Sequence, residues 1–131
     1  MKLPVIIHKA PNGKIQSIEY SPGGSEVALT ELHAISPDQL PWEGVTDFQR
    51  RVYRELMTVP AGTTVSYQEL AARVGNPNGA RAIGHAVARN PFLFVVPCHR
   101  VIKSDGGLGG FACGLEVKKR LLAFEAGRGA F

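Results

Sequence analysis

The stretch VVPCHRVI, residues 95–102, places a thiol beside two residues that can carry positive charge. Cys98 precedes His99 and Arg100, and apolar side chains flank the group on both sides. A thiol reacts as the thiolate, which is favoured by nearby positive charge and by a base that accepts the proton. His99 and Arg100 supply these residue types, and a distant acid could orient the histidine. The pattern is compatible with a nucleophilic cysteine.

Two other interpretations of Cys98 stay open from the residues alone. Cysteine is often buried, so an ordinary core position is the first of them. The second is a metal site, which the adjacent Cys98 and His99 support poorly because no chelating turn separates them and the sequence holds no CxxC pair. Nothing in the sequence requires a metal or an organic cofactor.

Composition restricts the class of protein. The 131 residues, 44% hydrophobic and 20% charged, suit one compact domain with a small N-terminal appendage. Two cysteines give no disulfide framework, no apolar run approaches the roughly 18 residues of a membrane span, and the N-terminus lacks a signal peptide's apolar stretch. We therefore expect an intracellular, reducing location, which is the cytoplasm or, in a eukaryote, the nucleus.

Charge is distributed unevenly along the chain. Residues 1–45 contain three lysines and five acidic residues, net −2, whereas residues 46–131 contain twelve lysines and arginines and six acidic residues, net +6. The basic second part fits a polyanionic partner such as nucleic acid. A basic surface can also serve solubility alone, so charge does not decide between these explanations.

Turn signals divide the N-terminal part into short strands. LPVIIH and IQSIEY flank the hairpin signal PNGK, and VALTELH follows the turn SPGGS as a third strand, within residues 3–33. Residues 35–45 contain two prolines and a glycine and are expected to form a linker. The predicted domains are therefore 1–45, a short β-rich segment with its linker, and 46–131.

Helix signals dominate the second part. Capping-box patterns begin at Thr46 and Ser66, each followed three positions later by Gln or Glu, and residues 60–62 end the first helix. The second helix stops at the breaker GNPNG and a third spans about 80–89, so the pair is a helix-turn-helix candidate. A further amphipathic helix, rich in lysine and arginine, is expected over about 115–126.

The third helix has an unusual surface. Ala80, Gly84 and Ala88 lie at i, i+4 and i+8 and form a smooth stripe with Arg81 beside it. Small side chains let another surface approach the backbone closely, which permits two explanations. The stripe packs against another helix, or it presses into the minor groove of a nucleic acid with Arg81 as the long reaching side chain.

The chain between the third and fourth helices combines a β-rich run with a glycine-rich loop. Residues 92–103, FLFVVPCHRVIK, form the run, in which Pro97 indicates a strand end or an edge. Cys98 is therefore expected where a strand opens. Residues 104–114, SDGGLGGFACG, contain five glycines and predict a loop that approaches another surface closely.

Two long segments resemble the C-terminal domain of the O6-alkylguanine-DNA alkyltransferases: VPAGTTVSYQELAARVGNPNGARAIGHAVARNP, residues 59–91, and VVPCHRVIKSDGGLGGFACGLEVKKRLLAFEAG, residues 95–127. The likeness runs through about residues 46–127, and PCHRV, SYQELA and LLxxE keep the family's order and spacing. The resemblance implies an α+β fold class, with a small N-terminal β-rich cap before a mainly helical, winged helix-turn-helix-like domain. That domain is expected to bind DNA and to carry the active site.

The activity implied by the resemblance is single-turnover DNA repair. An alkyl group, methyl above all, moves irreversibly from O6-alkylguanine in DNA to Cys98 after the base flips out from the minor groove, as in a methylated-DNA–protein-cysteine methyltransferase. By resemblance, His99 is the general base acting through a water, Glu125 orients the imidazole, and Asn90 lies at the hinge before the active-site strand. The expected partner is double-stranded DNA containing O6-alkylguanine, bound by a monomer without a cofactor.

The resemblance also assigns residues to DNA and to the substrate pocket. Arg81 would replace the flipped base in the stack, and Tyr67 would help to turn the nucleotide. Phe111 stands where the family usually has tyrosine, and Cys113 where it usually has glycine, so the pocket wall is altered. The rest of the DNA-binding set is Ala80, Gly84, Ala88 and Arg100. The pocket set is Val101, Phe111, Ala112 and Cys113.

Two alternatives to transfer remain. A non-catalytic alkyltransferase-like damage sensor would recruit other repair proteins, but such proteins replace the reactive cysteine and Cys98 is present. A helix-turn-helix transcription factor would bind one site without thiol chemistry, and the small-residue third helix disfavours it. The N-terminal part is also shorter than is common in the family.

Overall fold

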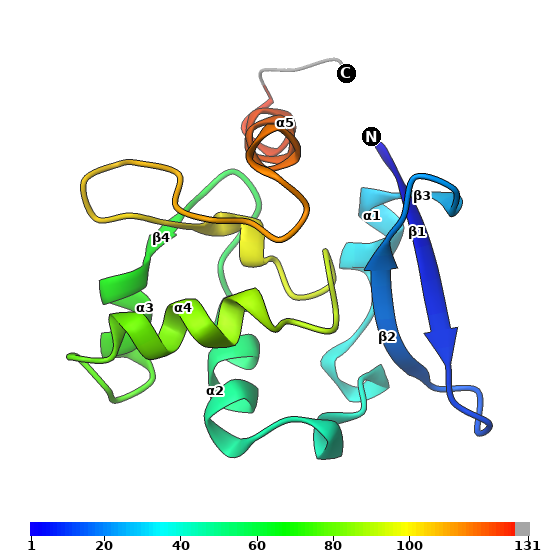
Figure 1. Ribbon diagram of the computed structural model, residues 1–131, viewed down its shortest axis with the longest axis horizontal. Helices are drawn as coiled ribbons and strands as arrows, with labels where there is room; N and C mark the ends of the chain where they lie inside the picture. Colours follow the sequence, from blue (N-terminus) through cyan, green and yellow to red (C-terminus); the bar gives the residue numbers. More distant parts are fainter. Residues whose placement is uncertain (128–131) are drawn as a thin grey trace.

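The computed structural model describes residues 1–127, which begin with a three-stranded antiparallel sheet. β1 (Lys2–Lys9) lies between β2 (Ile15–Tyr20) and β3 (Ser25–Ala28), at one end of the molecule's longest axis (Figure 1). β1 and β2 form the hairpin that PNGK predicts, and their alternating side chains bury one face of the sheet. This sheet is the expected N-terminal β-rich cap.

The predicted strand VALTELH is wrong in its second half, where α1 (Leu29–His33) forms instead. Leu29 and Leu32 lie three residues apart on one face of this helix and are each 1% exposed. A short apolar run fits strand and helix equally well, so the sequence pattern could not separate them. The expected linker contains two 3-10 turns, η1 (Pro37–Gln39) and η2 (Trp42–Gly44).

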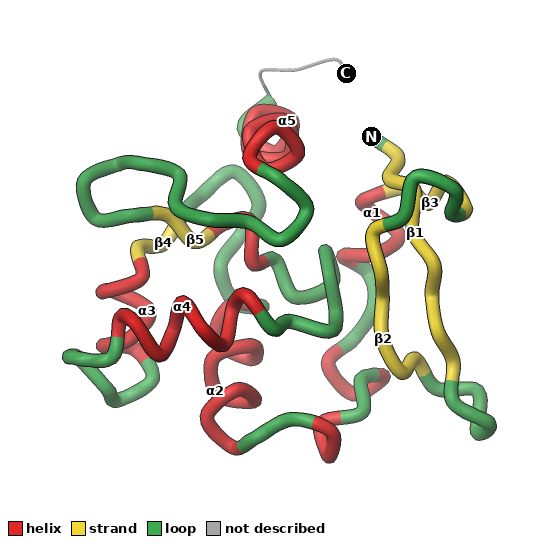
Figure 2. The backbone as a smooth tube through the Cα atoms, viewed as in Figure 1, coloured by secondary structure: helices red, strands yellow, loops and turns green. Residues whose placement is uncertain are grey.

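Three helices follow in the predicted order: α2 (Asp47–Leu56), α3 (Tyr67–Arg73) and α4 (Ala80–Ala88) (Figure 2). The capping box at the start of α2 is confirmed. Thr46 Oγ1 accepts from Gln49 N at 3.1 Å, and the Gln49 side chain accepts from Thr46 N at 2.9 Å. The apolar faces of the three helices meet in the core, and α3 and α4 form the helix-turn-helix pair.

The segment 92–102 contains less strand than the sequence predicts, and Cys98 lies on a 3-10 turn, η3 (Cys98–Arg100), instead of where a strand opens. Phe94 adopts a left-handed φ of 69°, which reverses the chain, and Pro97 has no N–H to donate to a ladder. The backbone therefore makes only isolated bridges before the last strand. The last strand, β5 (Val101–Ile102), pairs in parallel with the short strand β4 (Val65–Ser66).

The N-terminal sheet packs against the segment that leads to η3. Ile18 N donates to Pro91 O at 2.8 Å, and the Tyr20 ring meets the Phe94 ring edge-on with centroids 6.3 Å apart. Apolar side chains from the sheet and the helices belong to one buried cluster. The cap therefore supports the backbone that precedes Cys98.

The last element, α5 (Leu115–Glu125), follows the glycine-rich loop as predicted and packs on η3. Figure 1 shows it above η3 and separate from the helix-turn-helix pair. A three-stranded cap followed by a mainly helical part confirms the expected α+β fold class. None of the helices within residues 1–127 is long and apolar enough to cross a membrane.

The hydrogen bond at the N-terminus of α2 gives a first prediction. Thr46→Ala removes the side-chain acceptor for Gln49 N and should lower the free energy of unfolding by about 1 kcal/mol. Thr46→Ser keeps a hydroxyl at the same position and should unfold close to the wild type. Urea denaturation of the three proteins measures the difference, and equal losses in both variants would show that the cap hydrogen bond is not its source.

Candidate active site

Cys98 begins η3 and is only 3% exposed. Burial raises the pKa of its thiol, although a side-chain hydrogen bond from Asn90 and the charge of Lys118 act in the opposite direction. The resting side chain is therefore a protonated thiol at neutral pH, and any reaction at sulfur needs a base to take its proton.

Asn90 holds the segment before Cys98 in its turned shape. Its side-chain Nδ2 donates to Val96 O at 3.1 Å, and its Oδ1 accepts from Phe92 N at 2.9 Å. The residue is 7% exposed, so these bonds replace water contacts that burial removes. Asn90 thus lies at the expected hinge between α4 and η3 and fixes both sides of the turn.

Glu125, at the end of α5, is the acceptor at the centre of the site. Its Oε1 accepts from His99 Nε2 and from Arg100 Nε, each at 2.9 Å, and its Oε2 accepts from Arg100 Nη2 at 2.5 Å. Burial alone would raise the pKa of this carboxyl, but the bonds from Arg100 and His99 outweigh burial and lower the pKa to about 2. The carboxylate is charged throughout the neutral range.

His99 has one ring nitrogen engaged and one free. The side chain is 0% exposed, and Nε2 carries the proton that it donates to Glu125. His99 Nδ1 is then an acceptor, and it is the buried side-chain polar atom that finds no hydrogen-bond partner among the described residues. Burial lowers the pKa of His99 against the raising effect of Glu125. A neutral imidazole with an unused Nδ1, one residue from Cys98, can accept a proton.

Arg100 does not lie on an outer surface, so its expected place in the DNA-binding set is not where the structure puts it. Its side chain is 6% exposed, and beyond Glu125 it donates through Nη1 to Val59 O at 2.7 Å. A 3-10 turn has three residues per turn and directs successive side chains about 120° apart. Cys98, His99 and Arg100 therefore point in three directions, with Arg100 inward.

Lys118 is a further site residue, which the sequence analysis missed. It is 0% exposed, and its Nζ donates to the carbonyls of Val101 (2.6 Å), Leu108 (2.5 Å) and Gly110 (3.2 Å). Burial lowers its pKa to about 8, and the nearby Cys98 acts in the opposite direction. The ammonium ties β5 to the glycine-rich loop.

A signal for Lys118 was present in the sequence, whereas none existed for His33. Lys118, Leu121 and Glu125 lie at i, i+3 and i+7 on α5, so helical periodicity directs this lysine toward the core. His33, at the end of α1, comes within 3.6 Å of Glu125 Oε2 through its Nε2. No local pattern joins residues that far apart in the chain.

A cavity of about 420 Å³ lies between α4 and the glycine-rich loop. Tyr67 forms one wall, and Gly109 approaches it so closely that a Cβ there would lie 2.7 Å from Tyr67 Oη. This contact confirms that the loop approaches another surface. Cys98 is not among the residues that line it. The lining residues are Tyr67, Gly84, Val87, Ala88, Gly110, Phe111 and Ala112.

Two residues of the expected pocket set do not line this cavity. Val101 is 0% exposed and contributes its carbonyl to Lys118. Cys113 is half-buried against the core, where burial and the nearby Cys98 raise its pKa to about 12. Phe111 does face the cavity, and its ring meets the His99 ring edge-on with centroids 6.5 Å apart.

The small-residue stripe of α4 is open within the described chain. Apart from the neighbouring residues and backbone of α4 itself, no heavy atom lies within 4 Å of a Cβ built on Gly84, so this position of the stripe does not pack against another helix among the described residues. A second hollow of about 580 Å³ lies over the stripe, and Tyr67 lines both this hollow and the first cavity. Arg81 is exposed at its edge. Its lining residues are Tyr67, Ala80, Arg81, Gly84, His85 and Ala88.

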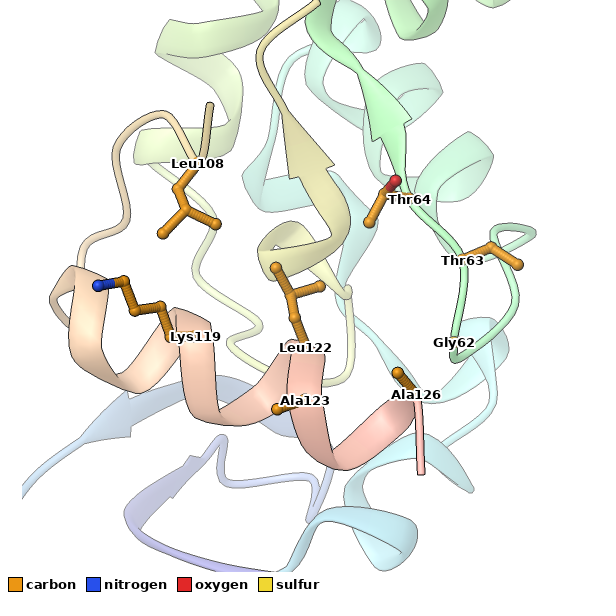
Figure 3. A pocket seen from close by; sticks show the side chains of 8 residues that line it. All are labelled: Gly62, Thr63, Thr64, Leu108, Lys119, Leu122, Ala123 and Ala126. Carbon is orange, nitrogen blue, oxygen red and sulfur yellow. The ribbon is translucent and has the colours of Figure 1, made fainter. Parts of the chain in front are cut away.

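A separate cavity of about 340 Å³ opens between α5 and the loop before β4 (Figure 3). Lys119 is the charged side chain in its lining, which holds no cysteine, histidine or carboxylate. Acid–base or nucleophilic chemistry therefore has no complete set of groups there. The cavity beside Tyr67 also lacks these residue types in its lining, but its Phe111 ring contacts the His99 ring. Its lining residues are Gly62, Thr63, Thr64, Leu108, Lys119, Leu122, Ala123 and Ala126.

The sequence is similar to DNA repair methyltransferases. Residues 47–127 match the family described as "6-O-methylguanine DNA methyltransferase, DNA binding domain". A methylated-DNA–protein-cysteine methyltransferase of Mycobacterium bovis is 42% identical over 113 residues, which cover 82% of this chain and 68% of the relative. The chain spans about half the length of several curated relatives, for example 42% of the Kluyveromyces lactis methyltransferase, which is 50% identical over 80 residues, or 61% of this chain.

Solved structures agree with the fold. An O6-methylguanine-DNA methyltransferase of Pyrococcus kodakaraensis strain KOD1 superposes with a TM-score of 0.72 at 27% identity, covering 94% of this chain and 98% of that one. Mycobacterium tuberculosis OGT in complex with DNA gives a TM-score of 0.64 at 46% identity over 68% of this chain and 53% of that one. The first of these similarities includes the N-terminal sheet.

Lys118 gives a prediction about the integrity of the site. Lys118→Met leaves three backbone carbonyls without their donor and should lower the free energy of unfolding by about 2–5 kcal/mol. Lys119→Met makes the same change at the next, exposed position of α5 and should cost less than about 0.5 kcal/mol. Chemical denaturation compares the two, and similar losses would mean that the buried contacts contribute nothing specific.

Proposed function

Because this chain belongs to the 6-O-methylguanine DNA methyltransferase family, we propose that it repairs DNA by moving the alkyl group of O6-alkylguanine onto Cys98 Sγ. The observation that carries the proposal is the free Nδ1 of His99, held in that tautomer by Glu125 beside a buried thiol. Each molecule reacts once, since a thioether has no low-barrier route back to a thiol. The chain is thus a methylated-DNA–protein-cysteine methyltransferase that is consumed by its reaction.

The proposed chemistry uses Cys98, His99 and Glu125 in sequence. His99 Nδ1 takes the thiol proton through one water, and the Glu125 carboxylate stabilises the imidazolium that forms. The thiolate attacks the alkyl carbon, the S–C bond forms as the C–O6 bond breaks, and the electron pair stays on the guanine. The proton that left Cys98 ends on guanine N1, so an intact guanine and an S-alkylcysteine are the products. No metal or cofactor takes part in any step.

The lesion is proposed to enter through the cavity beside Tyr67. Its volume is about 420 Å³, and Phe111, whose ring contacts the His99 ring, forms an aromatic wall on which a base can stack. The main-chain amide of Ala112, which lines the cavity, would recognise the guanine edge, which leaves side chains there free to vary. Tyr67 borders both this cavity and the outer hollow, so it lies on the path of a base that flips inward.

Duplex DNA is proposed to lie along the open face of α4. Ala80, Gly84 and Ala88 allow close approach of a minor groove, and Arg81 extends from the same helix to fill the gap left by the flipped base. The net charge of +6 over residues 46–131 supports phosphate contacts. The related Mycobacterium tuberculosis protein was solved with DNA, which supports the same partner here.

The proposed division of labour places DNA binding and transfer in residues 46–131 and support in residues 1–45. We propose a monomer that acts on DNA in the cytoplasm or, in a eukaryote, in the nucleus. A non-catalytic damage sensor needs neither a nucleophile nor a base. The pairing of Cys98 with a buried, oriented His99 favours transfer over that alternative.

The test of transfer is the mass of the protein after incubation with duplex DNA containing O6-methylguanine. We expect a gain of one CH2, because a methyl group replaces the thiol proton, and peptide mapping should locate it on Cys98. Cys98→Ala should keep DNA binding and gain no mass. An unchanged wild-type mass, or an adduct on Cys113, contradicts the assignment.

Arg81 gives a prediction that separates flipping from chemistry. Arg81→Ala should slow transfer from duplex DNA by about 10- to 100-fold, because unstacking a base costs a few kcal/mol that the arginine offsets. Transfer from a free alkylated base should change little. Arg50→Ala, which removes an exposed arginine paired with Asp47 on α2, is the matched control. Equal losses on both substrates would rule out the proposed role of Arg81.

A further inference from the structure

His33 ends α1, which together with the three-stranded sheet forms the N-terminal cap. Its side chain contacts the buried group formed by His99, Arg100 and Glu125. Its ring stacks on the His99 ring with centroids 6.2 Å apart and planes 11° apart. Its Nε2 lies 3.5 Å from Arg100 Nη2 and 3.6 Å from Glu125 Oε2. The side chain is 24% exposed, so the cap covers this edge of the site with a polar ring.

The neighbours of His33 determine its protonation state. Arg100 is always charged and can only donate, so His33 Nε2 must accept from it and the ring proton resides on Nδ1. Burial and the Arg100 charge lower the pKa of His33 to about 4; the charge of Glu125 acts the other way, and His99 lowers it further. At neutral pH, His33 is therefore an uncharged acceptor. Glu125 and His33 both accept from Arg100 Nη2.

The residue types His33, His99 and Glu125 also occur in metal sites, and their ligand atoms lie within 4.8 Å of one another. Here the Arg100 guanidinium already lies against both Glu125 Oε2 and His33 Nε2. A cation bound by the three would have to displace that permanent positive charge or lie beside it. The geometry favours a hydrogen-bonded network centred on Arg100.

We propose that His33 is a positioning residue for alkyl transfer, which holds Arg100 and, through it, Glu125 and the His99 ring in the reactive arrangement. The inference rests on the proposed function, and it makes the cap a contributor to the site. His99 has Glu125 as its hydrogen-bond partner, and Glu125 is in turn held by Arg100. Loss of the His33 acceptor and ring frees one Arg100 donor and opens one face of His99, so Nδ1 loses its fixed direction.

Two substitutions separate the acceptor from the ring. His33→Gln places an amide oxygen near the position of Nε2 and loses the aromatic ring, whereas His33→Phe keeps a stacking ring and loses the acceptor. His8→Ala is the control, because His8 lies on β1 of the same cap, is half exposed and has Glu19 as its ionic neighbour. Unfolding free energies are measured for all variants, so that loss of transfer is compared only among folded proteins.

The first measurement is the single-turnover rate constant for methyl transfer from a free O6-methylguanine base, which avoids DNA binding. His33→Phe should lower it by about 10-fold, because small misplacements of a reacting group cost this much or more. His33→Gln should remain within about 3-fold of the wild type, the scale of one neutral hydrogen bond. His8→Ala should match the wild type. A wild-type rate constant in His33→Phe overturns the proposal. A rate constant that is higher in His33→Phe than in His33→Gln also overturns it.

The second measurement needs no transfer and separates the two proposals. Nitrogen-15 NMR of the histidine rings reports which nitrogen of His99 carries the proton. The wild type and His33→Gln should show His99 protonated at Nε2 alone, and His33→Phe should show a mixture of tautomers. If the wild type transfers no methyl group, the proposed function fails while this comparison still tests the positioning role. Identical His99 signals in all three proteins overturn that role.

Discussion

The buried charge of Glu125 is the constraint on which the rest of the site depends. A carboxylate in the interior is stable only when donors satisfy it, and here both donors come from η3 while the carboxylate comes from the end of α5. The same hydrogen bonds therefore hold α5 against η3 and orient the His99 ring. The network also explains why Arg100 turns inward, since its guanidinium neutralises the charge that orients the neighbouring histidine.

The second constraint is the turn before Cys98. Phe94 holds a left-handed φ of 69°, which disfavours a bulky residue, and its ring is 0% exposed. Burial of that ring against Tyr20 and the hydrogen bond from Ile18 to Pro91 both come from the cap. The N-terminal sheet thus stabilises a backbone shape that local sequence opposes. Asn90 completes the support from the other side of the turn.

Local signals predicted much of the fold and part of the site. Capping residues located the starts of α2 and α3. The family resemblance carried by PCHRV and LLxxE, and no local signal, identified the histidine and the acid that the structure joins. Two kinds of feature escaped prediction for physical reasons. Short apolar runs such as VALTELH carry no distinct period, and the direction of Arg100 depends on a 3-10 turn that its sequence does not specify. The contact of His33 with η3 depends wholly on tertiary packing.

The separation of the acidic cap from the basic helices has a consequence for how the molecule meets its partner. The cap and the helix-turn-helix pair lie toward opposite ends of the longest axis (Figure 1), with net charges of −2 over residues 1–45 and +6 over residues 46–131. Such a molecule is an electric dipole, and the field of a polyanion exerts a torque on it before contact, within about 10 Å at 0.1 M salt. We expect diffusional encounters with DNA to occur mostly with α4 leading, which would shorten the rotational search of a protein that, under the proposed function, reacts only once.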